Sequence, residues 1–169
     1  MWWIGLHLPR LSLESFEATL SEEARAQPVA LVDAHRILAA NDAAAELGVE
    51  TGLKRATALA LAPQLLLGQA DAWRDAQALT AIAHAALAFT PSVCLAATDG
   101  VLLEVQASIR YFGGRAALLR RLQAVLAPLG HHVQMSSAPT AQGASLLSRW
   151  RGGVHCRDAA ALQRTLDLA

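Results

Sequence analysis

The sequence predicts an α+β fold, in which helices cover one face of a sheet of four or five strands and a small helical insertion follows the first strand. From residue 65 onward, short apolar runs alternate with amphipathic segments in the order β-α-β-β-α-β-α, which is typical of such a sheet. Hydrophobic residues make up 54% of the 169 residues and the mean hydropathy is +0.31, so the chain can bury a substantial core. Residues 11 to about 75 lie between the first strand and most of this pattern, and we expect them to form a small helical insertion.

The first strand is the apolar run WWIGLHL, residues 2–8, which ends at Pro9 because proline cannot donate a ladder hydrogen bond. Trp2 and Trp3 alternate across this strand, so one ring should pack inside and the other should lie outside or on a partner. The insertion opens with a helix in LSLESFEATL, and PVALVD and RILAAN follow as short strands around a turn. Further helices are expected in DAAAELG and LKRATALAL, and a short strand in QLLLGQ.

The remainder begins with a long helix over residues 71–89, whose apolar residues form one stripe. FTPSVCLAATDGVLLEV, residues 89–105, predicts a hairpin with Thr98-Asp99-Gly100 at its tip, because Asp-Gly is a favoured tight-turn pair. A helix in GGRAALLRRLQAVLAPLG, a strand in HHVQMSS, and helices in TAQGASLLSRW and AAALQRTLDLA complete the order. The last helical pattern reaches the end of the sequence, and we expect it to continue in a longer protein.

The net charge is zero but is distributed unevenly along the chain. Residues 1–109 hold 6 basic and 12 acidic side chains, whereas residues 110–169 hold 8 arginines and 2 acidic side chains. Only the last third can therefore offer a surface that attracts nucleic-acid phosphates. No apolar run is long enough to span a bilayer, and MWWIGLHL lacks the basic lead of a signal peptide, so we expect a cytoplasmic protein.

Cysteine and histidine residues are too scattered to predict a zinc site or a disulfide framework. Cys94 and Cys156 have no metal-ligand spacing, and nothing near His155 and Cys156 completes a set of four ligands. His131 and His132 begin an expected strand, where alternation would point them to opposite faces. We therefore predict no metal bound by these residues.

Five pieces of the sequence resemble the Y-family translesion DNA polymerases, in the family's order and spacing. They are PVALV, ILAANDAAAELGVETGL, ATALALAPQLLL, FTPSVCLAATDGVLLEV and ASIRYFGG, and together they cover most of the chain. Within this family, the sequence most resembles the ImuB-type members, which are bacterial homologues without a working active site. It implies a palm with a ferredoxin-like sheet and an inserted fingers domain. The implied domains are a palm over residues 1–10 and 76–152, fingers over 11–75, and the start of a thumb-like region over 153–169.

The resemblance also implies where the metal ligands of a polymerase would stand. Two Mg²⁺ ions need several carboxylates close together, and the family supplies one Asp in the first strand and an Asp-Glu pair at the hairpin. His7 occupies the first of these positions, Asp99 the second and Gly100 the third. One carboxylate out of three cannot organise two hard cations, and imidazole is a poor Mg²⁺ ligand. Asp99 is then a turn-forming residue or a residual metal ligand, and His7 a histidine at the rim or in the core.

The residues that would grip an incoming nucleotide are missing as well. The family uses a Tyr and an Arg in a fingers helix, and the matching positions hold Asp42 and Ala45. The family's Lys-bearing loop corresponds to residues 136–143, which contain no basic residue. A further family Lys falls around Arg149–Arg151, where an Arg can substitute. We therefore expect no catalytic residues, no cofactor and no bound metal.

A basic helix face remains as a candidate contact surface. Arg115, Arg120 and Arg121 lie in one helical segment, with Arg149 and Arg151 further along the chain. Such a face is either solvated or touches DNA backbone or an acidic partner.

The resemblance thus implies a non-catalytic scaffold in damage-induced translesion synthesis and mutagenesis, associated with the bacterial nucleoid. The partners it implies are a RecA-like companion (ImuA), an error-prone replicative-type polymerase and the sliding clamp, with weak DNA contact. Two alternatives stay open: an active nucleotidyltransferase with altered metal ligands, and an unrelated ferredoxin-like binding module. The second alternative predicts no insertion between the first strand and the long helix.

Overall fold

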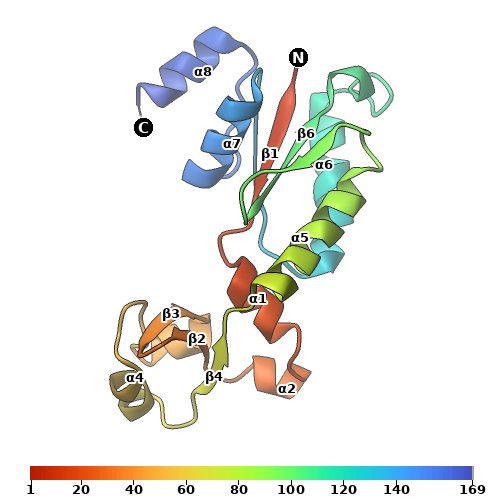
Figure 1. Cartoon of the computed structure of the whole chain (residues 1–169). Coiled ribbons are helices and arrows are strands. Elements are labelled where there is room, and N and C mark those ends of the chain that lie inside the picture. The colour runs from red at the N-terminus through yellow and green to blue at the C-terminus, as the bar shows by residue number, and fades with distance from the viewer. Residues whose placement is uncertain (169) are drawn as a thin grey trace. The chain divides into compact units, whose positions relative to one another are not determined.

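The computed structural model describes residues 1–168, which form two compact units (Figure 1). The first unit contains residues 1–9 and the chain from residue 76 onward, and the second contains residues 10–75. The insertion expected from the sequence is therefore present, because the second unit interrupts the first directly after its first strand. None of the helices within the described part is long and apolar enough to cross a membrane.

The first unit is built on a four-stranded antiparallel sheet of order β5-β6-β1-β7. Strand β1 (Trp3–His7) lies in the centre, between β6 (Gly100–Glu104) and β7 (Gln134–Ala138), and β5 (Val93–Leu95) pairs with the outer side of β6. The sheet has four strands rather than five because the run around QLLLGQ, which forms β4 (Leu66–Gln69), pairs within the second unit.

Helices lie on both faces of this sheet. Trp2, Ile4 and Leu6 are buried and alternate with Trp3, Gly5 and His7, so the two sets point to opposite faces. The expectation of helices on one face holds for α5 (Ala72–Ala86) and α6 (Arg115–Leu126), which each bury apolar side chains, and Arg115 of α6 lies over the ring of Trp2. Helix α7 (Ala141–Trp150) packs against the other face, on the side of Gly5.

The chain after α7 stays with the first unit. Val154 and Cys156 bond through their backbone to Ser137 of β7, and helix α8 (Ala159–Leu166) packs its inner side near the buried Cys156. Short 3₁₀ turns connect the other elements at Gln106–Ser108 and Ala127–Leu129. The assignment of residues 153–169 to the start of a thumb remains a prediction, and residue 169 lies outside the described residues.

The second unit combines a three-stranded sheet with four short helices. Its strand order is β3-β2-β4, in which β2 (Val29–Asp33) pairs antiparallel with β3 (Arg36–Ala40) and parallel with β4. The helices are α1 (Leu11–Glu17), α2 (Glu22–Arg25), α3 (Asp42–Glu46) and α4 (Arg55–Leu61). A core of small apolar side chains joins α3 and α4 to the sheet.

Asn41 connects the sheet of the second unit to helix α3. Its buried side-chain oxygen accepts hydrogen bonds from the backbone nitrogens of Ala44 and Val29, both at 3.0 Å. Its amide nitrogen donates to the carbonyl of Gln27 at 2.9 Å. One side chain thus caps the helix and fixes the entry to β2, because each bond satisfies a backbone group that the regular elements leave open.

The hairpin between β5 and β6 differs from the tight Asp-Gly turn that the sequence predicts. The strands are joined by residues 96–99, the Ala96 nitrogen donates to the Gly100 carbonyl at 2.8 Å, and Ala97 takes the left-handed conformation with φ 57°. Gly100 does not have a positive φ. The predicted Asp-Gly pair is therefore not the tight turn: Ala97 and Thr98 form the turn, Asp99 follows as the last residue of the loop, and Gly100 begins β6.

Candidate functional site

The structure brings together His7, Asp99 and Gly100, the three residues for which the resemblance implies metal-ligand positions. His7 ends β1 and pairs in register with Gly100, the first residue of β6. The Leu8 nitrogen donates to the Asp99 carbonyl at 2.9 Å, which holds the hairpin tip against the end of β1. The carboxylate of Asp99 and the imidazole of His7 therefore lie at the same end of the sheet.

The Asp99 carboxylate is paired with the guanidinium group of Arg149 on α7. One guanidinium nitrogen donates to Oδ2 at 3.1 Å, and the other contacts Oδ1, so the pair is bidentate. Such fork-to-fork pairs are among the stronger charge-assisted hydrogen bonds in proteins. The side chains of Asp99 and Arg149 are 31% and 37% exposed, which places the pair at the surface rather than in the core.

His7 stands beside this pair without a short contact to it. Its Nδ1 lies 3.6 Å from Asp99 Oδ2, which is an ion-pair distance for a protonated ring but is long for a hydrogen bond. The same buried nitrogen has no hydrogen-bond partner among the described residues. The side chain is only 13% exposed, so His7 is a rim histidine that borders the Asp99 carboxylate.

Arg149 reaches Asp99 because α7 lies directly on β1. A Cβ atom at Gly5 would come within 2.3 Å of the Ala144 carbonyl oxygen and 2.9 Å of the Ser148 hydroxyl, so only glycine allows this approach. Thr140 starts the helix, and its side chain accepts a hydrogen bond from the Gly143 nitrogen at 3.1 Å. The sequence thus fixes the helix at its first turn and at its contact with the strand, and Arg149 follows at its end.

Gly100, where the resemblance implies a third carboxylate, has no space for a side chain. A Cβ atom built on Gly100 would lie 2.8 Å from the Ala96 carbonyl oxygen and 3.1 Å from the Leu6 carbonyl oxygen. Both atoms belong to the backbone, so they cannot turn away as a flexible side chain would. In this hairpin, a glutamate at residue 100 requires the backbone itself to shift.

These contacts define what the site can do chemically. A guanidinium group already satisfies the single carboxylate, and no group of three His, Cys, Asp or Glu residues suited to a metal ion occurs within residues 1–168. Arginine cannot lose its proton at physiological pH, so it neutralises Asp99 permanently and offers no ligand to a cation. Two-metal chemistry needs several carboxylates that are free to bind cations. This site instead holds one carboxylate in a surface ion pair.

The residues expected in place of the nucleotide grip lie in the second unit, on α3. Asp42 is exposed and accepts a hydrogen bond from Arg10 at 3.2 Å. Ala45, one turn away, has no polar side chain. Helix α3 therefore presents a paired carboxylate, which does not attract a triphosphate.

Sequence reasoning missed a basic pocket in the second unit. It has a volume of about 590 Å³ and is lined by His35, Arg36, Lys54, Arg55, Ala56 and Leu59. The guanidinium group of Arg36 donates a 2.7 Å hydrogen bond to the Gly52 carbonyl. The backbone nitrogen of Arg55 donates to the His35 carbonyl at 2.8 Å. The basic pairs His35-Arg36 and Lys54-Arg55, in an otherwise acidic insertion, were the signal that could have found it.

A second cavity, of about 610 Å³, lies in the first unit and corrects the prediction for two histidines. His131 and His132 precede β7 instead of starting it, and both line this cavity with Arg120 and His155. His155 shares a 2.9 Å hydrogen bond between its Nδ1 and the Ser137 hydroxyl. Although part of its ring is exposed, burial against β7 lowers the pKa of His155 below the ordinary value of 6.5.

The five candidate contact arginines do not form one surface. Arg115 lies over the ring of Trp2 at 4.8 Å and Arg121 over the ring of Phe112 at 5.8 Å, whereas Arg120 lines the histidine cavity. Arg149 is engaged by Asp99, and Arg151 is exposed just after α7.

The two adjacent tryptophans of the first strand lie on opposite faces of the sheet. Trp2 is fully buried, and Trp3 is half-buried against the core beneath α7 and α8.

Comparisons with known proteins agree with this architecture. Residues 12–149 match the model of the impB/mucB/samB family. The chain is 35% identical over 104 residues to the protein ImuB of Caulobacter vibrioides, a match that covers 62% of this chain and 23% of ImuB. Among solved structures, DinB from Sulfolobus solfataricus superposes with a TM-score of 0.70 at 18% identity, over 98% of this chain and 51% of DinB. The insertion ternary complex of Dbh DNA polymerase gives a TM-score of 0.73 at 18% identity, over 99% of this chain and 52% of Dbh.

Proposed function

Because the chain belongs to the impB/mucB/samB family and has the palm and fingers fold of Y-family polymerases, we propose that it is a polymerase-like region that does not catalyse nucleotide transfer. Its role is that of a scaffold in damage-induced translesion synthesis. The chain spans 23% of the length of the ImuB proteins it matches, so this role concerns the whole protein of which such a region is part.

The observation that supports this proposal is the pairing of Asp99 with Arg149. A divalent ion at this site would have to displace a bidentate guanidinium and would then find one carboxylate. Mg²⁺ prefers octahedral oxygen coordination and binds firmly only where several hard ligands or substrate phosphates are already in place. With His7 and Gly100 at the other two positions, the remaining ligands would have to come from water.

The acidic character of helix α3 supports the same conclusion for the nucleotide. Asp42 pairs with Arg10, and α3 itself contains no basic side chain that could hold a triphosphate. Loss of the metal ligands and loss of the phosphate grip are independent changes, and each alone would slow nucleotide transfer severely.

Weak contact with DNA is assigned to the basic pocket of the second unit. His35, Arg36, Lys54 and Arg55 line it and no carboxylate does, so it suits a phosphate of a nucleic-acid backbone. The name ImuB of the relatives leads us to propose, for the whole protein, the partners of an ImuB-type scaffold: a RecA-like companion, an error-prone replicative-type polymerase and the sliding clamp.

Two titrations test the proposal. Adding a deoxynucleoside triphosphate with Mg²⁺ to the chain should give no saturable heat in isothermal titration calorimetry. Adding a fluorescent primer–template duplex should give weak binding, and the affinity should fall about tenfold in the variant Lys54→Glu/Arg55→Glu. The control Arg25→Glu reverses one charge elsewhere in the same unit and should change the affinity little. Saturable, Mg²⁺-dependent nucleotide binding that Asp99→Asn abolishes would instead support an active nucleotidyltransferase.

A further inference from the structure

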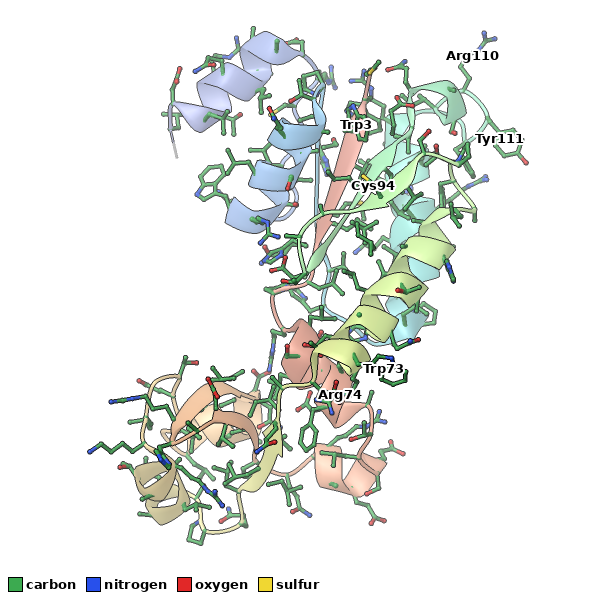
Figure 2. The ribbon with its side chains drawn as sticks, in the orientation of Figure 1. Trp3, Trp73, Arg74, Cys94, Arg110 and Tyr111 are labelled. Atoms are coloured by element: carbon green, nitrogen blue, oxygen red, sulfur yellow. The ribbon has the colours of Figure 1, made fainter. Side chains whose placement is uncertain are left out.

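The loop before α6 presents an exposed aromatic ring among arginines. Tyr111 is 84% exposed, and Figure 2 shows Arg110 and Tyr111 projecting away from the sheet into solvent. We call this surface the Arg–Tyr patch and define it as residues Arg110, Tyr111, Phe112, Arg115 and Arg121, with the buried Trp2 beneath Arg115. A large aromatic side chain exposed to this degree has no role in the core of the first unit.

The loop that carries Tyr111 is held firmly in place. The Phe112 nitrogen donates to the Ser108 carbonyl at 3.1 Å, and the Gly114 nitrogen donates to the Ile109 carbonyl at 2.8 Å. Phe112 stacks on Phe89 with ring centroids 4.9 Å apart, and Tyr111 meets Phe112 edge-on at 5.0 Å. A ring that is already positioned loses little conformational entropy when a partner covers it, which is a property of binding hot spots.

Two of the three arginines in the patch are also positioned, and none of the three has an acidic partner among residues 1–168. Arg115 and Arg121 lie over aromatic rings, which orient a guanidinium group without using its N–H donors. The sequence contains no Asp or Glu between residues 105 and 157, and the carboxylate that precedes this stretch, on Glu104, accepts a hydrogen bond from the Gln106 backbone nitrogen at 3.0 Å. Within residues 1–168, no ion pair involves Arg110, Arg115 or Arg121.

The position of the patch favours a protein partner over nucleic acid. The Val105 nitrogen bonds to the Trp2 carbonyl at the start of β1, whereas His7 and Asp99 lie at its other end. A strand rises about 3.3 Å per residue, so the patch begins roughly 15 Å from the degenerate metal site. A strand of DNA placed at that site therefore does not need the patch.

We propose that the Arg–Tyr patch docks an acidic segment of a protein partner. Carboxylates of the segment pair with Arg110, Arg115 and Arg121, and an apolar side chain packs against Tyr111 and Phe112. Arginine and tyrosine are enriched at the energetic centres of protein interfaces, whereas a bare solvated face needs no exposed aromatic ring. The inference rests on the proposed scaffold role, because it specifies the chemistry of one partner surface.

The probe for this inference is a short synthetic peptide rich in Glu and Leu, compared with the same peptide carrying Gln in place of Glu and with single-stranded oligo-dT. Binding to the chain is followed by fluorescence anisotropy and by backbone NMR shifts. The acidic peptide should bind with a Kd on the order of 0.1 mM at low salt, with shifts confined to residues 106–121 and to the start of β1. The Gln peptide should bind at least about tenfold more weakly.

Matched variants identify the contacts. The double variant Arg110→Glu/Arg121→Glu should weaken binding of the acidic peptide more than about tenfold, and Tyr111→Ala should weaken it about fivefold. Tyr111→Phe should retain binding. Arg164→Glu, an exposed charge reversal on α8, should change little. Thermal unfolding confirms that each variant is folded.

Three results would overturn the inference. They are tighter binding of oligo-dT at the same residues, no binding of the acidic peptide, or equal weakening by Arg164→Glu. None of these results bears on metal or nucleotide binding, so the inference can fail while the proposed function stands.

Discussion

Removing the ion pair between Asp99 and Arg149 should lower the free energy of unfolding by a measurable amount. The loss should come from the interaction between the two side chains rather than from either side chain alone. The perturbation is a double-mutant cycle of Asp99→Asn, Arg149→Met and the double variant. Methionine keeps much of the aliphatic stem that packs at the end of α7, so the cycle isolates the charge interaction.

The magnitude follows from the geometry and the exposure of the pair. Hydrogen bonds between charged groups contribute about 1.5–3 kcal/mol when shielded, whereas freely exposed pairs contribute about 0.2–1 kcal/mol. The Asp99–Arg149 pair is bidentate, but its side chains are 31% and 37% exposed, so solvent screens much of the attraction. We therefore expect a coupling free energy of about 1 kcal/mol at low salt.

Urea denaturation of the four proteins, in low salt and in about 1 M NaCl, measures this coupling. The coupling should fall by about half or more at high salt, because the pair is partly exposed. A coupling below about 0.3 kcal/mol, or one that salt leaves unchanged, would refute the reasoning that Asp99 is held by Arg149 in place of a cation.

Three further predictions concern the residues around this site and elsewhere in the two units. Gly100→Ala and Gly100→Glu should both destabilise the chain by about 1–3 kcal/mol in urea denaturation, because the Cβ atom shared by both meets backbone oxygens; a neutral Gly100→Glu would contradict this. Asn41→Ala should cost about 2–3 kcal/mol through the loss of three hydrogen bonds, and the exposed Asp42→Ala less than about 1 kcal/mol; similar losses would show that Asn41 is not the link between β2 and α3. His155 has a lowered pKa in the folded chain, so the unfolded chain takes up the proton first when the pH is lowered below about 6.5. The free energy of unfolding therefore decreases as the pH decreases. His155→Asn should reduce this fall between about pH 7.5 and 5.5, and an unchanged pH profile would exclude the contribution.

The strands and helices of the first unit follow closely from the sequence, because their patterns are local. The apolar run of β1 and the stripe along α5 each predict their element without knowledge of the rest. The sequence predicts the insertion because residues 11 to about 75 lie between the first strand and the long helix. Its strand β4 could not be assigned to the correct sheet, since pairing with β2 depends on the whole second unit.

The contacts of the candidate site were less accessible to sequence reasoning. Arg149 lies 50 residues from Asp99 in the sequence, and no local sequence pattern predicts that the two side chains pair. The pairing depends on Gly5, whose missing side chain lets α7 lie on β1, and on the hairpin loop, in which Ala97 is left-handed and Asp99 directly precedes β6. A favoured Asp-Gly sequence predicted a different turn because tertiary contacts with β1 override local preference.

The central claim is that the end of β1 holds an ion pair in place of a divalent metal, and Mn²⁺ titration monitored by electron paramagnetic resonance tests it most directly. The matched control is His7→Asp/Arg149→Met, which removes the guanidinium and places a second carboxylate beside Asp99. The account predicts no Mn²⁺ site in the natural chain with a Kd below about 1 mM, and one weak site in the control. Tight binding of one or two Mn²⁺ ions by the natural chain, lost in Asp99→Asn, would contradict the account.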